Sequence, residues 1–154
     1  MTQPTYAPRR EPNMTDPSDL RMAVIRSIVE GRRVIRVEGD GARLILDNDT
    51  VLYLYMSDSD CCASANGTWV IDPDHLEAII TDVKVTPDAE RSDPVSEYGE
   101  TTNYATVSIL HNQNPIALAD CYANDGNGGY YFSVLSLAVT VQDQKIIEMA
   151  VVES

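Results

Sequence analysis

Apolar residues recur at a helical spacing in one stretch near the start of the chain. Within residues 19–29 they return every three or four positions, which is the period of an amphipathic helix. Ser18 precedes this stretch as a candidate N-cap, and Gly31 follows it as a plausible stop. The pattern therefore predicts one N-terminal helix. Residues 1–17 carry four prolines among polar residues, which indicates a flexible, extended arm.

After the helix, the apolar period changes to two, which is typical of β-strands. Strands are expected over residues 32–38, 43–46 and 51–56. Turn-forming residues, at 39–41 and 47–50, join each strand to the next. Because short turns connect neighbouring antiparallel strands, the sequence predicts an antiparallel meander.

The rest of the chain predicts further short elements. Asp72 and Pro73 begin a short helix over residues 75–79, and the polar stretch 86–101 reads as a loop. The segment 146–152 is either a last edge strand or a contact for a partner. The other strand candidates cover residues 69–71, 82–85, 104–110, 116–122 and 130–141.

Together these elements predict an α+β fold, a mostly antiparallel bent sheet or small open barrel of six to eight strands with one N-terminal helix and one short helix. The expected organisation is a flexible Pro-rich arm over 1–17, a single domain over 18–143 and a C-terminal extension over 144–154. The expected core consists of Ile35, Val37, Leu44, Leu46, Leu52, Leu54, Val107, Ile109, Leu135 and Leu137.

The charge is strongly acidic and uneven. The net charge is −13, yet residues 1–43 hold eight of the eleven basic side chains. The remaining acidic body would repel phosphates, so direct binding of nucleic acid is disfavoured. An acidic surface can instead meet a basic protein, mimic nucleic acid or simply maintain solubility.

No apolar run is long enough to span a membrane, and no export signal is recognised. The three cysteines then indicate free thiols in a reducing compartment.

The segment 57–63, Ser-Asp-Ser-Asp-Cys-Cys-Ala, is the strongest candidate for chemistry. Adjacent cysteines on an extended chain point to opposite faces, so they poorly suit a shared metal, and a disulfide between Cys61 and Cys62 would need a distorted peptide. Catalysis by cysteine with His75 or His111 lacks the basic surroundings that activate a thiol. We therefore expect no metal, no cofactor and no catalytic residue. One of the two cysteines is expected to be buried at a structural corner.

Tyrosines and one tryptophan fall mostly on strands, where they either pack the sheet or line a pocket for a planar ligand. The Asp and Asn residues near 58–60 and 124–127 lack the ligand pattern of a calcium loop, and turns explain them better. The candidate ligand or partner surface comprises Asp58, Asp60, Cys61, Trp69, Tyr130 and Tyr131.

Several motifs, in the same order, resemble a family of small uncharacterised proteins encoded mainly by bacteriophages of actinobacteria and their hosts. These are Gly31-Arg-Arg-Val-Ile, residues 44–54, Asp60-Cys61-Cys62-Ala63, Ala105-Thr-Val-Ser and Gly129-Tyr-Tyr. The resemblance covers roughly residues 31–141. It implies a phage origin and a meander that runs into an Asp-Cys-Cys loop, and it implies no particular reaction.

Three functions follow as hypotheses. The first is a non-enzymatic phage protein that binds a host or phage macromolecule, most simply a protein, in the host cytoplasm. The second is a virion accessory component docked through its N-terminal arm. The third is a protein that binds and sequesters a small molecule on its tyrosine-lined face.

Overall fold

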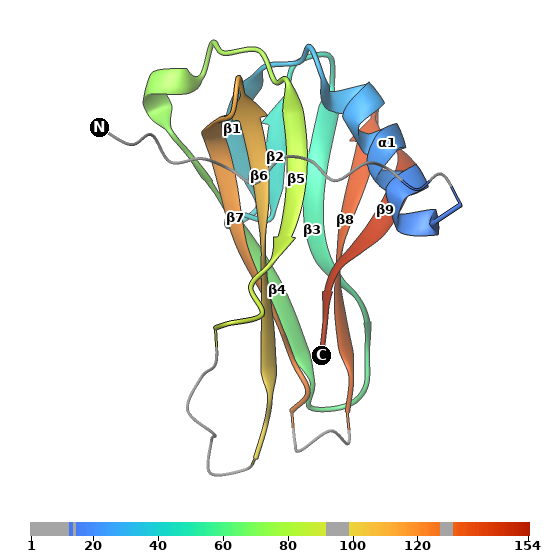
Figure 1. The fold of residues 1–154 in the computed structure, drawn as a ribbon. Coiled ribbons are helices and arrows are strands. Elements are labelled where there is room, and N and C mark those ends of the chain that lie inside the picture. Colours follow the sequence, from blue (N-terminus) through green and yellow to red (C-terminus); the bar gives the residue numbers. More distant parts are fainter. Residues whose placement is uncertain (1–12, 14, 92–98, 127–130) are drawn as a thin grey trace.

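Nine strands and one α-helix form the part of the chain that the computed structural model describes, residues 13, 15–91, 99–126 and 131–154 (Figure 1). A single 3₁₀ turn, η1, covers Pro73–His75. The helix and strands are α1 Pro17–Val29, β1 Val34–Glu38, β2 Arg43–Leu46, β3 Thr50–Ser59, β4 Ser64–Ile71, β5 Asp82–Pro87, β6 Thr102–His111, β7 Asn114–Asn124, β8 Ser133–Val141 and β9 Gln144–Glu153.

The strands form two sheets that share one core. One sheet has the order β1-β2-β3-β8-β9 and the other β4-β7-β6-β5. Every described pairing is antiparallel, and β1, β2 and β3 are successive neighbours. The α+β class and the opening meander are therefore confirmed. The sequence underestimated the strand number, and the described strands divide into two sheets without closing into a barrel.

The core lies between the inner faces of the two sheets, and eight of the ten expected core residues are buried in it. Val37 is partly buried against this core. Ile35 is a correction, because 45% of it is exposed. A register shift between Val34 and Arg36 leaves Ile35 as the extra residue of a β-bulge, so the inward alternation resumes only at Val37.

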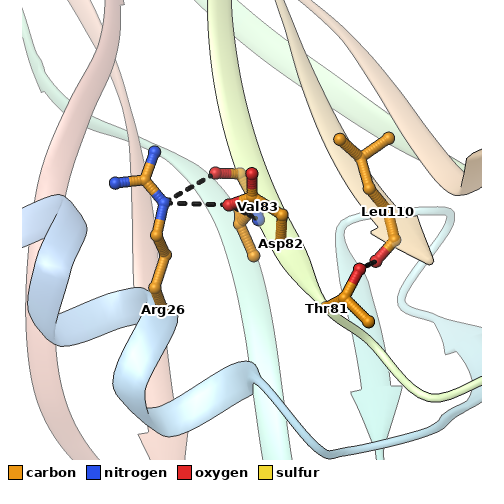
Figure 2. A network of polar contacts seen from close by, with 5 residues as sticks. All are labelled: Arg26, Thr81, Asp82, Val83 and Leu110. Carbon is orange, nitrogen blue, oxygen red and sulfur yellow. Dashed lines mark hydrogen bonds and ion pairs between the residues drawn. The ribbon is translucent and has the colours of Figure 1, made fainter. Parts of the chain in front are cut away.

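Helix α1 closes the side of the core where the two sheets end, contacting β9 of one sheet and β5 of the other. Met22, Ile25 and Val29 are its buried residues. Arg26 fastens it to β5, since its Nε lies 3.0 Å from Asp82 Oδ1 and 3.2 Å from the Val83 carbonyl (Figure 2). The contact is partly buried, so it fixes the helix against a sheet edge whose backbone would otherwise be open.

The N-terminal end of α1 differs slightly from the expectation, whereas the helix ends at Val29 as predicted. Asp16, rather than Ser18, is the N-cap, and its side chain accepts from the Ser18 backbone N–H at 2.8 Å. Gly31 follows the helix with a φ of 87°, a conformation that glycine adopts without strain. Its N–H donates to the Ile80 carbonyl at 2.8 Å. The chain therefore leaves the helix directly into a contact with the segment before β5.

The expected short helix over residues 75–79 is wrong in extent, because the 3₁₀ turn covers only Pro73–His75. Ile79 instead forms an isolated bridge with Arg33, and the Ile80 N–H donates to the Arg32 carbonyl. These hydrogen bonds require an extended backbone, which a longer helix would not provide. Thr81, the next residue, is tied to the Leu110 carbonyl at 3.3 Å (Figure 2).

The C-terminal segment forms β9, which pairs with β8 along its length and is the edge of the five-stranded sheet. This confirms the edge-strand interpretation of residues 146–152, and Met149 and Val152 reach the core. Most of the expected arm over residues 1–17 lies outside the described residues. No helix in the described ranges has the length and apolar character needed to cross a bilayer.

Candidate functional site

Most of the predicted site residues meet at one end of the molecule. Here β3 passes into β4 of the other sheet, and residues 131–132 lead into β8; we call residues 58–63, 125–126 and 131–133 the crossover end (lower end in Figure 1). Asp58 pairs with Val134, and the Asp60 N–H donates to the Phe132 carbonyl at 2.9 Å. Asp58, Asp60 and Cys61 thus lie beside the segment that carries Tyr131. Tyr130 lies outside the described residues.

Residues 60–63, which we call the cysteine corner, form a tight turn. The Ala63 N–H donates to the Asp60 carbonyl at 3.3 Å, and Cys62 has a φ of 75°. This left-handed conformation is uncommon for a residue other than glycine, so the surrounding contacts must hold it. Gly126 provides one of them, because a Cβ at that position would collide with the Cys62 carbonyl. The corner therefore depends on close approach of the two crossing segments.

Both Cys61 and Cys62 are exposed, so the expectation that one of them is buried was wrong. The turn carries them past the strand ends, where no sheet covers them. Because Cys62 is not extended, the two side chains do not diverge, and their Sγ atoms lie 3.1 Å apart. The hydrogen bond and the charge of Cys61 raise the pKa of the Cys62 thiol. A neutral thiol at neutral pH is a weak nucleophile.

A buried serine fastens the strands beneath this corner. Ser133 is fully buried, and its Oγ lies 2.9 Å from the carbonyl oxygens of both Ser64 and Asn124. Its backbone N–H donates to Ser154 Oγ at 2.9 Å. One side chain thereby connects β4, β7 and β8 at the point where the sheets meet. The sequence carries no signal for this role, since a serine within a strand is usually a surface residue.

Asp125 is a second buried polar residue at the crossover end. Its Oδ1 accepts from the Thr101 N–H at 2.9 Å, and its own N–H donates to the Thr101 carbonyl at 3.1 Å. The Asn124 side chain in turn accepts from the Gly126 N–H at 2.7 Å. These bonds hold the chain that leaves β7 in place behind the cysteine turn, as expected for Asn and Asp in turns.

Trp69 does not belong to the surface, which corrects its place among the candidate residues. It is 2% exposed and packs in the core. Its backbone N–H donates to the Gly41 carbonyl at 2.8 Å, while its indole Nε1 has no hydrogen-bond partner within the described ranges. The position on β4 places it on the inner face of the four-stranded sheet, in line with Gly67.

The described tyrosines on the strands do not converge on one pocket. Tyr53 and Tyr55 stack on β3, with ring centroids 5.1 Å apart. They pair with the small residues Ala138 and Ser136 of β8, which explains why that strand is buried on both faces. Tyr104 lies instead on the four-stranded sheet, where the Arg91 guanidinium sits 3.8 Å from its ring centroid.

That tyrosine forms part of a cleft of ≈490 Å³ between the end of β9 and the β5–β6 edge. Asp88, Arg91, Asn103 and Glu153 are among its other lining residues. The Asn103 amide donates to the Glu153 carbonyl at 2.8 Å, which bridges the two sheets at this edge. Tyr104 is one of the strand tyrosines from which the sequence suggested a pocket, whereas none of the described candidate surface residues, Asp58, Asp60, Cys61, Trp69 and Tyr131, lines the cleft.

Neither histidine belongs to the crossover end, and each has a hydrogen-bond partner of its own. His75 Nδ1 is 2.9 Å from Asp72 Oδ2, and His111 Nδ1 is 2.6 Å from the Ile79 carbonyl. Bonds from the Asp74 backbone and the His75 side chain lower the pKa of Asp72. Within the described residues, no three His, Cys, Asp or Glu side chains form a group suited to holding a metal ion.

Comparison with known proteins identifies one family. A domain of unknown function, DUF7448, matches residues 23–138, from within α1 to within β8. No curated protein matches the chain, and no solved structure does. The matched region covers well over half of the 154 residues and includes the crossover end up to Ser133. The chain is therefore a member of the DUF7448 family.

Proposed function

We propose that this protein is a non-enzymatic phage protein that binds a host or phage macromolecule, most simply a basic protein in the host cytoplasm, through its crossover end. The observation that carries the proposal is the composition of that end. The exposed Asp58 and Asp60 lie beside Phe132, which is 39% exposed, and Met56, farther along β3, is 41% exposed. Apolar contact area bordered by charge is a usual feature of protein-binding surfaces.

The character of the thiols supports binding rather than catalysis. The pKa of Cys62 is raised, whereas a catalytic cysteine needs a lowered one. Burial raises the pKa of Cys121 to about 12, so its reactive thiolate form is disfavoured as well. The phage origin rests on the resemblance of the Asp-Cys-Cys and Gly-Tyr-Tyr motifs to actinobacteriophage proteins.

Charge reversal tests the proposed surface. The double variant Asp58→Lys/Asp60→Lys removes the two exposed carboxylates of the crossover end and leaves the buried Asp125 in place. The matched control, Glu30→Lys/Glu77→Lys, makes the same change in net charge at exposed positions on other elements. Each protein is cross-linked in a lysate of the host, and the bound proteins are quantified by mass spectrometry.

We expect one basic partner to be recovered with the parent protein and the control, and to fall at least about tenfold with the crossover variant, as when charge pairs at an interface are lost. Equal recovery of that partner in all three samples would contradict the proposed surface. Absence of any specific partner in all three would contradict the proposed function itself.

The cleft near Tyr104 favours a second candidate, the binding of a small molecule. Its volume of ≈490 Å³ lies within the range of ligand pockets. Arg91 and Tyr104 would offer a cationic and an aromatic surface to a planar anion. A thermal-shift screen with nucleotides would reveal stabilisation that Tyr104→Ala abolishes. No stabilisation by any nucleotide would count against this candidate.

A further inference from the structure

The proposed function makes no use of the two exposed thiols at the cysteine corner. Cys61 and Cys62 present two exposed thiols whose sulfur atoms are 3.1 Å apart. The third thiol, Cys121, is 2% exposed and faces the core. A reagent in solution therefore meets one pair of neighbouring thiols on the folded protein.

We propose that Cys61 and Cys62 are a modification site, at which a low-molecular-weight disulfide oxidises the pair to a reversible vicinal disulfide. The proposal does not depend on the binding of a partner. It rests on the separation of the sulfur atoms, on their exposure and on the turned backbone that places them together.

The turned backbone of the corner already places the two sulfur atoms side by side. Cys62 is held in the left-handed region, with the Asp60 N–H fixed to Phe132 and the Cys62 carbonyl packed against Gly126. Closing the bond brings the sulfur atoms from 3.1 Å to about 2.05 Å, a movement of about 1 Å. Side-chain rotation supplies part of this movement, and distortion of the peptide between Cys61 and Cys62 supplies the rest.

The same geometry disfavours a shared metal ion as the use of this pair. Metal–thiolate bonds of about 2.3 Å, as zinc forms, would enclose an angle of about 85° at the metal if the sulfur atoms kept their separation. That angle is far below the tetrahedral value that zinc prefers. No third ligand group accompanies the thiols within the described ranges.

The resulting disulfide would be easy to reduce. Consecutive Cα atoms are about 3.8 Å apart, whereas the Cα atoms of most disulfides are separated by at least about 4.4 Å. The strain of the small ring raises its tendency to accept electrons, and exposed, strained disulfides are the labile ones. The site is therefore suited to reversible modification rather than to structural cross-linking.

The reaction proceeds in two exchange steps that balance. A deprotonated Cys61 sulfur attacks one sulfur of the small disulfide RSSR, whose S–S bond breaks and releases RS⁻, which takes up a proton. Cys62, after losing its proton, attacks Cys61 Sγ in the mixed disulfide and expels the second RS⁻. In sum, the two protein thiols are oxidised to one disulfide, and RSSR is reduced to two molecules of RSH.

The test uses the full chain and glutathione disulfide as the oxidant. After incubation under native conditions, intact mass and thiol counting are measured before and after treatment with dithiothreitol. We expect the loss of two hydrogen atoms, one remaining thiol after denaturation, a peptide in which Cys61 and Cys62 are linked, and full reversal by dithiothreitol. Cys121→Ala is expected to oxidise in the same way.

Variants that lack one of the two paired cysteines make the result specific. Cys61→Ser and Cys62→Ser lack the second thiol, so each should retain one bound glutathione instead of closing a ring. The proposal is overturned if the parent protein also accumulates stable glutathione adducts, if it forms disulfide-linked dimers, or if Cys61 and Cys62 both remain reduced under conditions that modify the single variants.

Discussion

The five-stranded sheet and strand β7 of the other sheet contribute side chains of different sizes to the core they share. The five-stranded sheet presents large aliphatic residues, and Leu44, Leu52, Leu54, Leu135 and Leu137 are essentially fully buried. Strand β7 of the other sheet presents only small ones along most of its length: Ala117, Ala119, Cys121 and Ala123. Trp69 on the neighbouring β4 supplies the missing volume, and it pairs directly with Ala119.

This asymmetry shows how a close-packed interior is reached without equal contributions from each layer. Large residues on one sheet fill the space above small ones on the other, as dense packing requires. At Gly67 the packing leaves no room for a side chain. A Cβ there would lie 2.8 Å from Cys121 Sγ and 3.1 Å from both the Leu54 and Leu135 side chains. Substitutions on β4 therefore test the comparison from both directions, by removing the large Trp69 beside the small residues of β7 and by enlarging the small Gly67.

The largest effect is expected from Trp69→Ala. This change removes the bulky side chain that projects from β4 into the core beside the alanines of β7. It leaves a cavity that those alanines cannot fill, so the free energy of unfolding should fall by about 4 kcal/mol. Urea denaturation measures it. Val70→Ala, at the next residue, which is 66% exposed, is the control and should change stability by less than about 0.5 kcal/mol. Equal effects would show that Trp69 is not the main filler.

A pH effect of intermediate size is expected from Cys121. Burial raises its pKa from 9.0 to about 12, so the folded state keeps a proton that the unfolded state releases. Stability should therefore fall as the pH rises from about 9 towards 12, at about 1.4 kcal/mol per pH unit, so that about 3 kcal/mol is lost by a pH of about 11.

The matched measurement is urea denaturation of Cys121→Ala across the same pH window. Lysines and tyrosines titrate in both proteins, so the difference between the two slopes isolates the thiol. Parallel slopes for the parent and the variant would mean that Cys121 is accessible to water in the folded protein.

A smaller loss is expected from Gly67→Ala, which tests the comparison by adding volume. The new methyl group must displace Cys121 or the leucines that face it, and overpacking of this kind costs about 2 kcal/mol. The double variant Gly67→Ala/Cys121→Ala, which removes the sulfur at the closest contact, should recover part of that loss. No recovery would indicate that the two leucines, rather than the thiol, limit the space.

The smallest effect is expected from Arg26→Ala, which loosens the helix that joins the two sheet edges. The side chains of Arg26 and Asp82 are 16% and 18% exposed, and losing a partly buried pair should cost about 1 kcal/mol. Hydrogen exchange should accelerate in α1 and leave β2 and β3 unchanged. Arg21→Ala, on the exposed side of α1, is the control; the same acceleration there would show that the contact with β5 is not what holds the helix.

Alternation in the sequence was enough to locate most strands, because each buries one face and exposes the other. It missed the first half of β4, where the inward residues Ala65 and Gly67 are too small to produce an apolar period. It also left the division into two sheets undetermined. The pairing of β3 with β8 joins residues as distant as Thr50 and Val141, and period two carries no information on partners so far away.

The turn that follows β3 was predicted in place but not in conformation. The Asp-Cys-Cys segment marked the corner after β3, and the structure has a turn there. The exposure of both cysteines follows from the positive φ of Cys62, which residue type does not announce, since cysteine has no preference for that conformation. Ser133 and Gly126 act through partners remote in sequence, so their roles needed the folded chain.

The route of the chain between the sheets also has a consequence for the order of folding. The four-stranded sheet comes from one continuous segment, β4 to β7, whereas the five-stranded sheet needs the meander at one end of the chain to meet β8 and β9 at the other. Closing such a long loop is entropically slow. We expect amides of β6 and β7 to gain protection before those of β3 in pulse-labelling during refolding. During synthesis, β1, β2 and β3 would then pair with one another, while the free edge of β3 would stay unpaired until β8 has emerged.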